Sequence, residues 1–369
     1  MARALSDAER RAWLRLARAQ NVGPATFANL IARYPDPLEA LVEVPRLARR
    51  GGGSDLRIPS DDDARRELDA LSKLGGRMIA SSEPEFPKGL AALEAPPPLI
   101  CMLGHASVLQ REMVAIVGAR NASALGRKFA QSIAAELGEA GLVIASGLAR
   151  GIDTAAHEGS LATGTCAVVA GGIDIVYPPE NQALYDRIRA EGAIVSEMPV
   201  GQAPQARHFP RRNRIIAGLS RGVVIVEAAE GSGSLITANY ALEQNREIFA
   251  VPGSPLDPRA KGTNRLLREG ATLTESAADV LNALRPILGG SFREPDHASG
   301  GGHRNARTTD AEADRVRRQI IELLGPSPVD VDELVRQSQE PVAAVLTVLL
   351  ELELAGRIMR YAGNKVSLA

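Results

Sequence analysis

Short apolar runs of strand length recur through the middle of the chain, separated by segments with helical spacing. The six clearest runs are residues 114–117, 142–145, 167–170, 193–195, 223–226 and 248–251. Helical patterns of crossover length, such as 124–140 and 236–245, lie between most of them. Continuously apolar strands are typical of a parallel sheet buried on both faces. The pattern therefore predicts a Rossmann-like α/β module with an extended parallel sheet over about 98–284.

Residues 5–48 repeat apolar positions at helical spacing, which predicts a helical N-terminal domain. The pattern breaks at Asn21-Val22-Gly23-Pro24, a turn like that of a helix-hairpin-helix or SAM-like domain. The glycine permits close approach of the backbone to a phosphate, but many α-hairpins use such a turn for packing alone. Both interpretations stay open. A short helix is expected at 64–74, after a glycine-rich loop at 51–53.

The composition changes to Gly, Ser, Asp, Arg and His after Pro286, which predicts a flexible linker. From Thr308 three helical patterns follow, to about 324 and over 331–337 and 341–355, and then two short strands at 357–361 and 365–368. Three helices followed by a two-stranded ribbon are typical of a winged helix. We expect domains at 1–85 (helical), 86–285 (Rossmann-like) and 308–369 (winged helix), with the linker at 286–307.

The chain has 369 residues, of which 45% are hydrophobic, enough for two or three buried cores. No run of eighteen apolar residues occurs and the start is charged, so a cytoplasmic protein without a membrane span is expected. Cys101 and Cys166 lie in apolar runs, which indicates neither a disulfide nor a metal site. Because the formal net charge is only −1, any surface that binds anions must come from local clustering.

The first strand-to-helix turn of the module occupies the place of a dinucleotide fingerprint without matching it. It begins Gly118-Ala119-Arg120, so a guanidinium stands where a cofactor site needs bare backbone. The next strand ends at Ser146-Gly147 without an acidic residue for a ribose. The sequence therefore predicts no nicotinamide cofactor, and a phosphate contact for Gly118 and Arg120. A salt bridge at a helix start is the alternative for Arg120.

Two further turns place glycines before a helix. The first carries Ser146, Gly147 and Arg150, and its unsatisfied amides favour an anion. Asp153 and His157 follow at a spacing that suits an internal hydrogen bond better than a metal site. The second turn is read in two ways, as a phosphate site or as a simple helix N-cap. Its candidate residues are Gly233, Ser234 and Thr237.

The densest basic segment lies at 207–221, and no acidic side chain occurs from Gly201 to Arg221. Uncompensated arginines in a chain of near-zero charge create a local positive field, which suits a polyanion backbone. Arg211, Arg212 and Arg214 are therefore candidates for phosphate contact. Since aromatic residues make up only 3% of the chain, base stacking is expected to be secondary.

Taken in order, the motifs at 118–120, 146–153, 209–220 and 233–238 resemble those of the bacterial DNA-processing family called DprA or Smf, and 251–253 resembles a later motif of it. The resemblance implies binding of single-stranded DNA and loading of the RecA recombinase onto it during natural transformation. It also implies a homodimer, no cofactor and no catalysis. By this resemblance Arg120 contacts DNA phosphate. A lysine that some relatives carry after the Tyr-Pro element is missing after Tyr177-Pro178.

Two other functions fit parts of the pattern. A Rossmann-like nucleotide hydrolase of the phosphoribohydrolase type would also hold phosphate on glycine-rich turns, with Glu227 or Glu243 as its carboxylate. A winged-helix regulator with a sensor domain is the third hypothesis. The predicted third helix of the winged helix, however, carries Glu351 and Glu353 and no basic residue before Arg357. We therefore expect that it does not read duplex DNA as its main task.

Overall fold

The computed structural model describes residues 3–53, 56–289, 310–361 and 363–369. Two compact units are distinguished by their internal contacts. The first consists of Arg65–Gly290 together with the first five residues, and the second combines Ser6–Ala64 with Ser291–Ala369. No helix among the described residues is long and apolar enough to cross a membrane.

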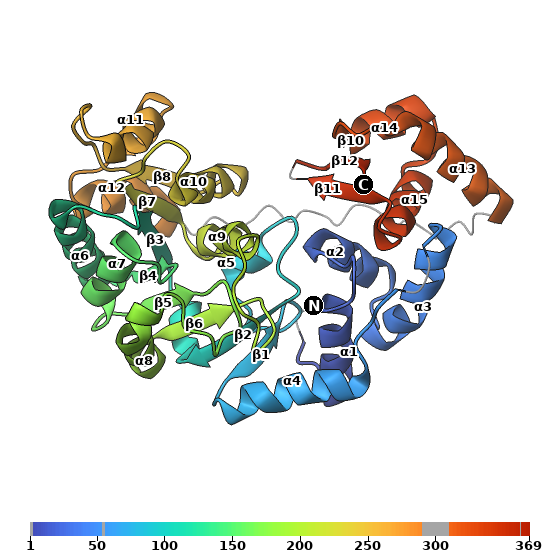
Figure 1. The fold of residues 1–369 in the computed structure, drawn as a ribbon, viewed down its shortest axis with the longest axis horizontal. Helices are drawn as coiled ribbons and strands as arrows, with labels where there is room; N and C mark the ends of the chain where they lie inside the picture. Colours follow the sequence, from blue (N-terminus) through green and yellow to red (C-terminus); the bar gives the residue numbers. More distant parts are fainter. Residues whose placement is uncertain (1–2, 54–55, 290–309, 362) are drawn as a thin grey trace. The chain divides into compact units, whose positions relative to one another are not determined.

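A nine-stranded sheet forms the centre of the first unit, in the order β1-β2-β6-β5-β4-β3-β7-β8-β9 (Figure 1). All pairs from β6 to β9 are parallel, which confirms the predicted sheet, whereas β2 pairs antiparallel with both β1 and β6. The strands are β1 (Arg77–Ala80), β2 (Leu99–Gly104), β3 (Met113–Gly118), β4 (Val143–Ser146), β5 (Thr165–Val168), β6 (Ala193–Ser196), β7 (Gly222–Val226), β8 (Glu247–Ala250) and β9 (Thr272–Leu273).

Helices cover both faces of this sheet (Figure 1). Alternate residues of β3 show the two layers, because Met113, Ala115 and Val117 belong to one core cluster and Val114 and Ile116 to the other. Leucines, isoleucines and alanines of α9 and α10 fill the first cluster, and those of α6, α7 and α12 fill the second. The helices are α4 (Asp61–Lys73), α5 (Lys88–Ala91), η1 (Ala106–Gln110), α6 (Ala124–Glu139), α7 (Ile152–Ser160), η2 (Pro179–Asn181), α8 (Gln182–Glu191), α9 (His208–Leu219), α10 (Gly233–Glu243), η3 (Pro258–Ala260), α11 (Lys261–Arg268) and α12 (Ala277–Gly289).

Two of the predicted boundaries differ from the structure. The sheet begins before residue 86, because β1 pairs with β2 in register from Arg77↔Met102 to Ala80↔Leu99. The predicted linker started at residue 286, whereas α12 runs through Pro286 to Gly289. The apolar residues Ile287 and Leu288 continue the helix beyond Pro286, where the composition alone predicts a linker. Residues 290–307 of the predicted linker lie outside the described part of the chain.

The second unit holds the helices of both chain ends. The N-terminal segment forms α1 (Asp7–Ala17), α2 (Pro24–Arg33) and α3 (Pro37–Arg50). Ser6 starts α1 with a reciprocal capping box to Glu9, and Asp36 caps α3. The C-terminal segment has the predicted winged-helix order, with a three-stranded sheet β10-β12-β11. Its elements are α13 (Asp310–Leu323), β10 (Val329–Asp330), α14 (Val331–Ser338), α15 (Val342–Leu354), β11 (Ile358–Tyr361) and β12 (Lys365–Leu368).

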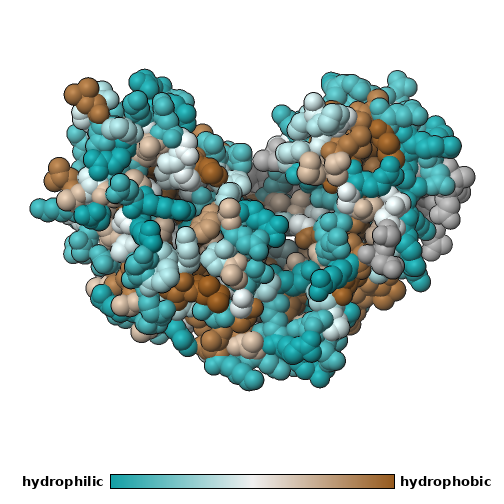
Figure 2. All heavy atoms as spheres, viewed as in Figure 1, coloured by the Kyte–Doolittle hydropathy of each residue, from teal (hydrophilic) through white to brown (hydrophobic). Residues whose placement is uncertain are grey.

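On the face drawn in Figure 2, hydrophobic residues lie in separate areas within a mostly hydrophilic surface. Large apolar side chains that are exposed in the first unit include Leu125, Leu242 and Leu256. Single exposed apolar residues are normal for a folded protein. These exposed residues therefore do not by themselves indicate a binding site.

Candidate functional site

A cleft of about 660 Å³ lies at the carboxyl ends of β3 and β7. These two strands are neighbours, but β3 continues through α6 to β4 on one side and β7 through α10 to β8 on the other. The loops that leave them diverge, and the crevice at such a point is where open α/β sheets bind ligands. Side chains from both loops and from α9 line the cleft, among them Arg120, Phe209, Arg212, Ser232, Ser234 and Thr237.

Arg120 and Phe209 form the outer wall of this cleft. Arg120 is exposed, and its guanidinium carbon lies 5.3 Å from the centroid of the Phe209 ring. The ring of Tyr177 also lies near Phe209, with the two centroids 5.6 Å apart and the ring planes tilted by 60°. A smaller pocket of about 40 Å³ opens beside them and shares Arg120, Phe209 and Arg212 with the large cleft. One cation and two aromatic rings are therefore presented together.

Arg212 lines both clefts together with Arg120 and is buried, with only 7% of its surface exposed. Its Nε and Nη1 atoms have no hydrogen-bond partner among the described residues. Burial lowers the pKa of Arg212 to about 10, while Asp153 raises it and Arg120 lowers it further. The side chain therefore stays charged at neutral pH. A buried cation beside a second cation is an arrangement that an anion in the cleft would stabilise.

The backbone of the turn after β4 donates hydrogen bonds to the buried carboxylate of Asp153. The backbone N–H groups of Gly147 and Ala149 donate to Asp153 Oδ2 at 3.1 and 3.3 Å. Burial raises the pKa of Asp153, and Arg212 and the two N–H groups oppose this rise. Ser146 is fully buried and donates from its hydroxyl to the carbonyl oxygen of Ile116 at 2.6 Å. These donors are already used within the protein.

Gly147 still has a direct part in the site. A Cβ atom at this position would lie 1.4 Å from Nη1 of Arg212. Only glycine leaves room for the guanidinium where it now lies. The predicted residue is therefore needed for the position of Arg212, while its own amide faces Asp153.

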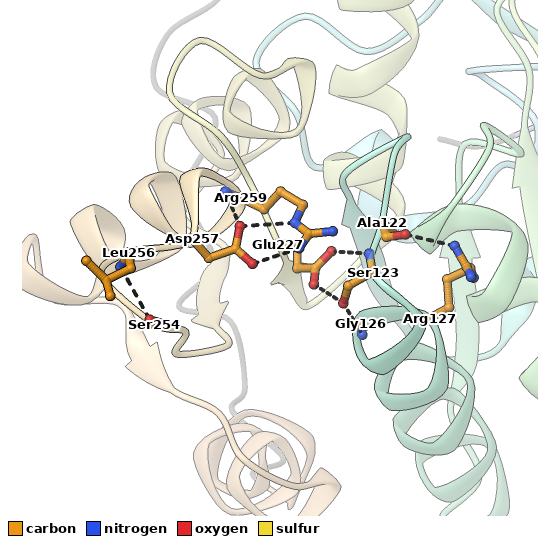
Figure 3. A network of polar contacts seen from close by, with 9 residues as sticks. All are labelled: Ala122, Ser123, Gly126, Arg127, Glu227, Ser254, Leu256, Asp257 and Arg259. Atoms are coloured by element: carbon orange, nitrogen blue, oxygen red, sulfur yellow. Dashed lines mark hydrogen bonds and ion pairs between the residues drawn. The ribbon is translucent and has the colours of Figure 1, made fainter.

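The turn after β3 is closed in a similar way by Glu227 (Figure 3). The N–H of Ser123 donates to Glu227 Oε2 at 2.9 Å, and the Ser123 hydroxyl donates to Oε1. The same hydroxyl accepts from the N–H of Gly126 at 2.8 Å and caps α6. Ser123 thus caps α6 from within the protein, and Arg120 is the cation that this turn contributes to the lining of the cleft. The Glu227 carboxylate, proposed for a hydrolase, is engaged in this structural network.

The turn before α10 remains open toward the cleft. Ser232 is its N-cap residue and makes no side-chain hydrogen bond to the helix amides; its hydroxyl lies 2.7 Å from that of Ser234. A Cβ atom at Gly233 would have nothing within 4 Å. Asn213 holds the turn in place by donating to the Gly233 carbonyl oxygen at 3.1 Å. Hydroxyls, helix amides and the dipole of α10 therefore all face the same cavity.

The remaining arginines have different positions. Arg150 lines the small pocket and forms an exposed ion pair with Glu180 at 2.6 Å. Exposed pairs of this kind are weak, so Arg150 is available to another anion. Arg214 pairs with Glu197 at 2.5 Å in a mostly buried contact. Arg211 is exposed on α9 and is not among the residues that line either cleft.

The structure thus brings together most of the predicted residues. Those that line the large cleft are Gly118, Arg120, Arg212, Gly233, Ser234 and Thr237, and those that line the small pocket include Gly147 and Arg150. Phe209, Tyr177 and Arg259 also line them, although the sequence did not single them out. The sequence signal for Phe209 is its position as an aromatic residue inside an arginine-rich segment. Within the described ranges, no cluster of three or more His, Cys, Asp or Glu residues is placed to hold a metal ion.

Three family models match the chain in the order of its domains. The model described as DprA-like N-terminal HHH domain matches residues 7–70, and the one described as DNA recombination-mediator protein A matches 77–285. A model described as DprA winged helix domain matches 304–364. The central match alone spans more than half of the chain.

Individual relatives agree with these matches. The chain is 31% identical to Protein Smf of Synechocystis sp. over 98% of this chain and 99% of that protein. It is similar to the X-ray structure of DNA processing protein A (DprA) from Streptococcus pneumoniae, with a TM-score of 0.61 and 32% identity over 76% of this chain and 98% of that one. A structure of DNA processing protein A from Helicobacter pylori, described by its single-stranded DNA binding mode, has a TM-score of 0.53 and 29% identity over 57% and 96% of the two chains.

Proposed function

The chain belongs to the DprA/Smf family, and on that premise we propose that it binds the backbone of single-stranded DNA in the cleft between β3 and β7. In this proposal it delivers that DNA to RecA during natural transformation in the cytoplasm. The observation that carries the binding step is the pair Arg120 and Arg212, two cations that line the same cleft, where Arg120 lowers the pKa of the buried Arg212. DNA phosphates would supply negative charge beside both guanidinium groups.

Three groups would share the phosphate contacts. Arg120 and Arg212 supply guanidinium donors from one wall, and the open N-terminus of α10 supplies amides and the hydroxyls of Ser232 and Ser234 from the other. Arg150 would join them by exchanging Glu180 for a phosphate. A DNA backbone that crosses the cleft would accept hydrogen bonds from the turns after β3 and β7.

The aromatic pair favours a single strand over a duplex. Phe209 and Tyr177 lie beside the cationic groups, where bases that are free of a partner strand can stack. In a duplex the base faces are covered by neighbouring pairs, so this contact is lost. The H. pylori relative, whose structure is described by its single-stranded DNA binding mode, supports the same choice.

Delivery to RecA and assembly as a homodimer belong to the proposal through family membership. The proposal includes no catalytic step. One of the two carboxylates considered for a nucleotide hydrolase, Glu227, accepts hydrogen bonds from the N–H and hydroxyl of Ser123.

The test has two arms. Binding of one oligonucleotide, single-stranded and then as a duplex, is measured by fluorescence anisotropy; tighter binding of the single strand supports the proposal, and equal or tighter binding of the duplex contradicts it. RecA filament formation on the single strand is then followed with and without the protein. Faster filament formation supports delivery of DNA to RecA. An unchanged or slower rate contradicts delivery to RecA and leaves the proposed DNA binding in place.

A further inference from the structure

The third helix of the winged helix, α15, is buried on more than one side. Val345, Val348, Leu349 and Leu352 belong to the core of the winged helix. Leu350 and Leu354 do not belong to that core cluster, yet only 3% and 1% of their surfaces are exposed. Apolar residues buried on two sides of one helix mean that both of these sides are covered. In DNA-binding proteins of this type, the corresponding helix leaves one polar face free for the groove.

The N-terminal helices α2 and α3 of the same unit pack against α15. The contact at the end of α3 is between backbones. A Cβ atom at Gly51 would lie 2.0 Å from the Glu351 carbonyl oxygen, and one at Gly53 would lie 3.0 Å from Ala355 Cα. A larger residue at Gly51 would therefore force the two segments apart. The glycine-rich loop is a packing surface for α15.

Two side chains join the same surfaces with hydrogen bonds. Asn21 donates from Nδ2 to the carbonyl oxygen of Leu354 at 3.1 Å, which satisfies one of the free carbonyls at the end of α15. Arg33 donates from Nη1 to the hydroxyl of Thr347 at 3.1 Å. Asn21 belongs to the turn between α1 and α2, the turn that a helix-hairpin-helix would present to DNA. The two elements of this unit that resemble duplex-binding elements thus contact each other.

The charges of α15 agree with a protein partner. Glu351 is 1% exposed and pairs with Arg317 at 2.6 Å, and Glu353 pairs with Arg360 at 3.3 Å. These carboxylates are matched within the winged helix, so they carry little unpaired charge into the contact with α3. Since α15 contains no lysine or arginine, it also offers no cation to a DNA phosphate.

From these contacts we propose that α15 is the docking surface for the chain's own N-terminal helices. The two terminal domains then move as one unit. In this arrangement the winged helix acts as an intramolecular clamp, which means that it holds the N-terminal helices against α15 and does not bind duplex DNA. This inference goes beyond single-stranded DNA binding and does not depend on it, since none of its residues lines the cleft between β3 and β7.

A disulfide lock tests the contact in the full chain. The Cβ built at Gly53 lies 3.2 Å from Cβ of Ala355, near the spacing of about 3.5–4.5 Å that a disulfide uses. The natural Cys101 and Cys166 are both buried in the first unit, so they leave the readout clear. Under mild oxidation we expect the double variant Gly53→Cys/Ala355→Cys to form an intramolecular disulfide, detected by mass spectrometry of peptides. The control pair is Gly53→Cys/Gly325→Cys, since a Cβ at Gly325 has no neighbour within 4 Å.

A further substitution at Gly51 tests whether formation of the disulfide depends on the proposed contact. In the presence of Gly51→Val the Gly53/Ala355 disulfide should form at least about tenfold more slowly, because a side chain there meets the Glu351 backbone. Gly325→Val is the matched background and should leave the rate unchanged. Equal rates in all backgrounds, or no disulfide in the original pair, would overturn the proposed contact.

The functional arm uses a duplex oligonucleotide as the probe. If α15 stays docked, the oxidised and reduced forms of the locked chain bind the duplex with affinities within about twofold. A much weaker duplex affinity of the oxidised form would show that α15 leaves its partner to bind DNA, which contradicts the proposal. Binding of the single-stranded oligonucleotide is measured in parallel. A loss of this binding would contradict the proposed function of the cleft in the first unit but would not contradict the contact of α15 with the N-terminal helices.

Discussion

The carboxylate of Glu227 accepts hydrogen bonds from both the backbone N–H and the hydroxyl of Ser123, and so closes the start of α6 (Figure 3). Asp153 does the same for the turn after β4 through the N–H groups of Gly147 and Ala149. A phosphate therefore meets guanidinium groups and the turn before α10, where the Ser232 cap leaves the helix amides open. This distribution of donors suits a phosphate chain better than a cofactor pyrophosphate bound to the first turn.

The pair Glu227 and Gly126 should show coupled energetics. Glu227→Ala leaves the Ser123 N–H without its acceptor and should lower the free energy of unfolding by about 1–3 kcal/mol. Gly126→Ala places a Cβ 2.6 Å from Cδ of Glu227 and should be destabilising as well. In the Glu227→Ala background that clash is gone, so Gly126→Ala should cost less there. Urea unfolding of the two single variants and the double variant measures this; strict additivity contradicts it.

Arg212 is expected to act in both stability and binding. Arg212→Met leaves Asp153 buried without its cation, so the free energy of unfolding should fall by about 3 kcal/mol. Adding Asp153→Asn removes the uncompensated carboxylate and should restore part of this loss. Binding of single-stranded DNA should stay weak in both variants, because the guanidinium is absent. Recovery of binding in the double variant would mean that Arg212 is only structural.

Phe209 should contribute to affinity without changing its salt dependence. Phe209→Ala removes a stacking surface beside Arg120 and should weaken binding of the single strand by about 1–3 kcal/mol. The slope of log affinity against log salt should stay the same, since no phosphate contact is lost. Anisotropy titrations at several salt concentrations separate the two effects. A reduced slope in Phe209→Ala would show that the ring acts mainly by positioning Arg120.

His157 predicts a dependence of stability on pH. Burial, with a smaller effect of Arg212, lowers the pKa of His157 from 6.5 to about 3 in the folded protein. Below pH 6.5 the unfolded chain therefore binds a proton that the folded chain does not. This group should remove up to about 1.4 kcal/mol of stability for each pH unit below 6.5, until the folded pKa is reached. His157→Gln should flatten the unfolding free energy between pH 6.5 and 5; an unchanged slope would contradict the assignment.

Element type and order followed well from the sequence where periodicity was strong. The six apolar runs correspond to β3–β8, and the three C-terminal helices and the ribbon lie within a few residues of their predicted limits. By contrast, β1, β9 and β10 are not predicted. Strands β9 and β10 have only two residues each, and β1 has three apolar residues after Arg77, so each gives too little pattern and forms through pairing with a neighbouring strand.

The chemistry of the site followed less completely. The basic character of Arg120 and Arg212 could be read from the sequence, because it depends on charge clustering. The use of the Gly147 amide by Asp153 could not, since the same glycine-rich turn binds a ligand or an internal carboxylate according to tertiary contacts. Arg214 looks like its neighbours in the sequence, but the turn of α9 directs it to Glu197.

Arg120 provides the most direct test of the proposed function. Single-stranded oligonucleotide binding is titrated against salt for the wild type, Arg120→Glu, and the control Arg187→Glu, an exposed reversal on α8 outside both clefts. We predict that Arg120→Glu weakens binding at least about tenfold and lowers the salt slope by about 0.7 or more, while Arg187→Glu binds like the wild type. Equal affinity and slope for Arg120→Glu and the wild type would contradict the account.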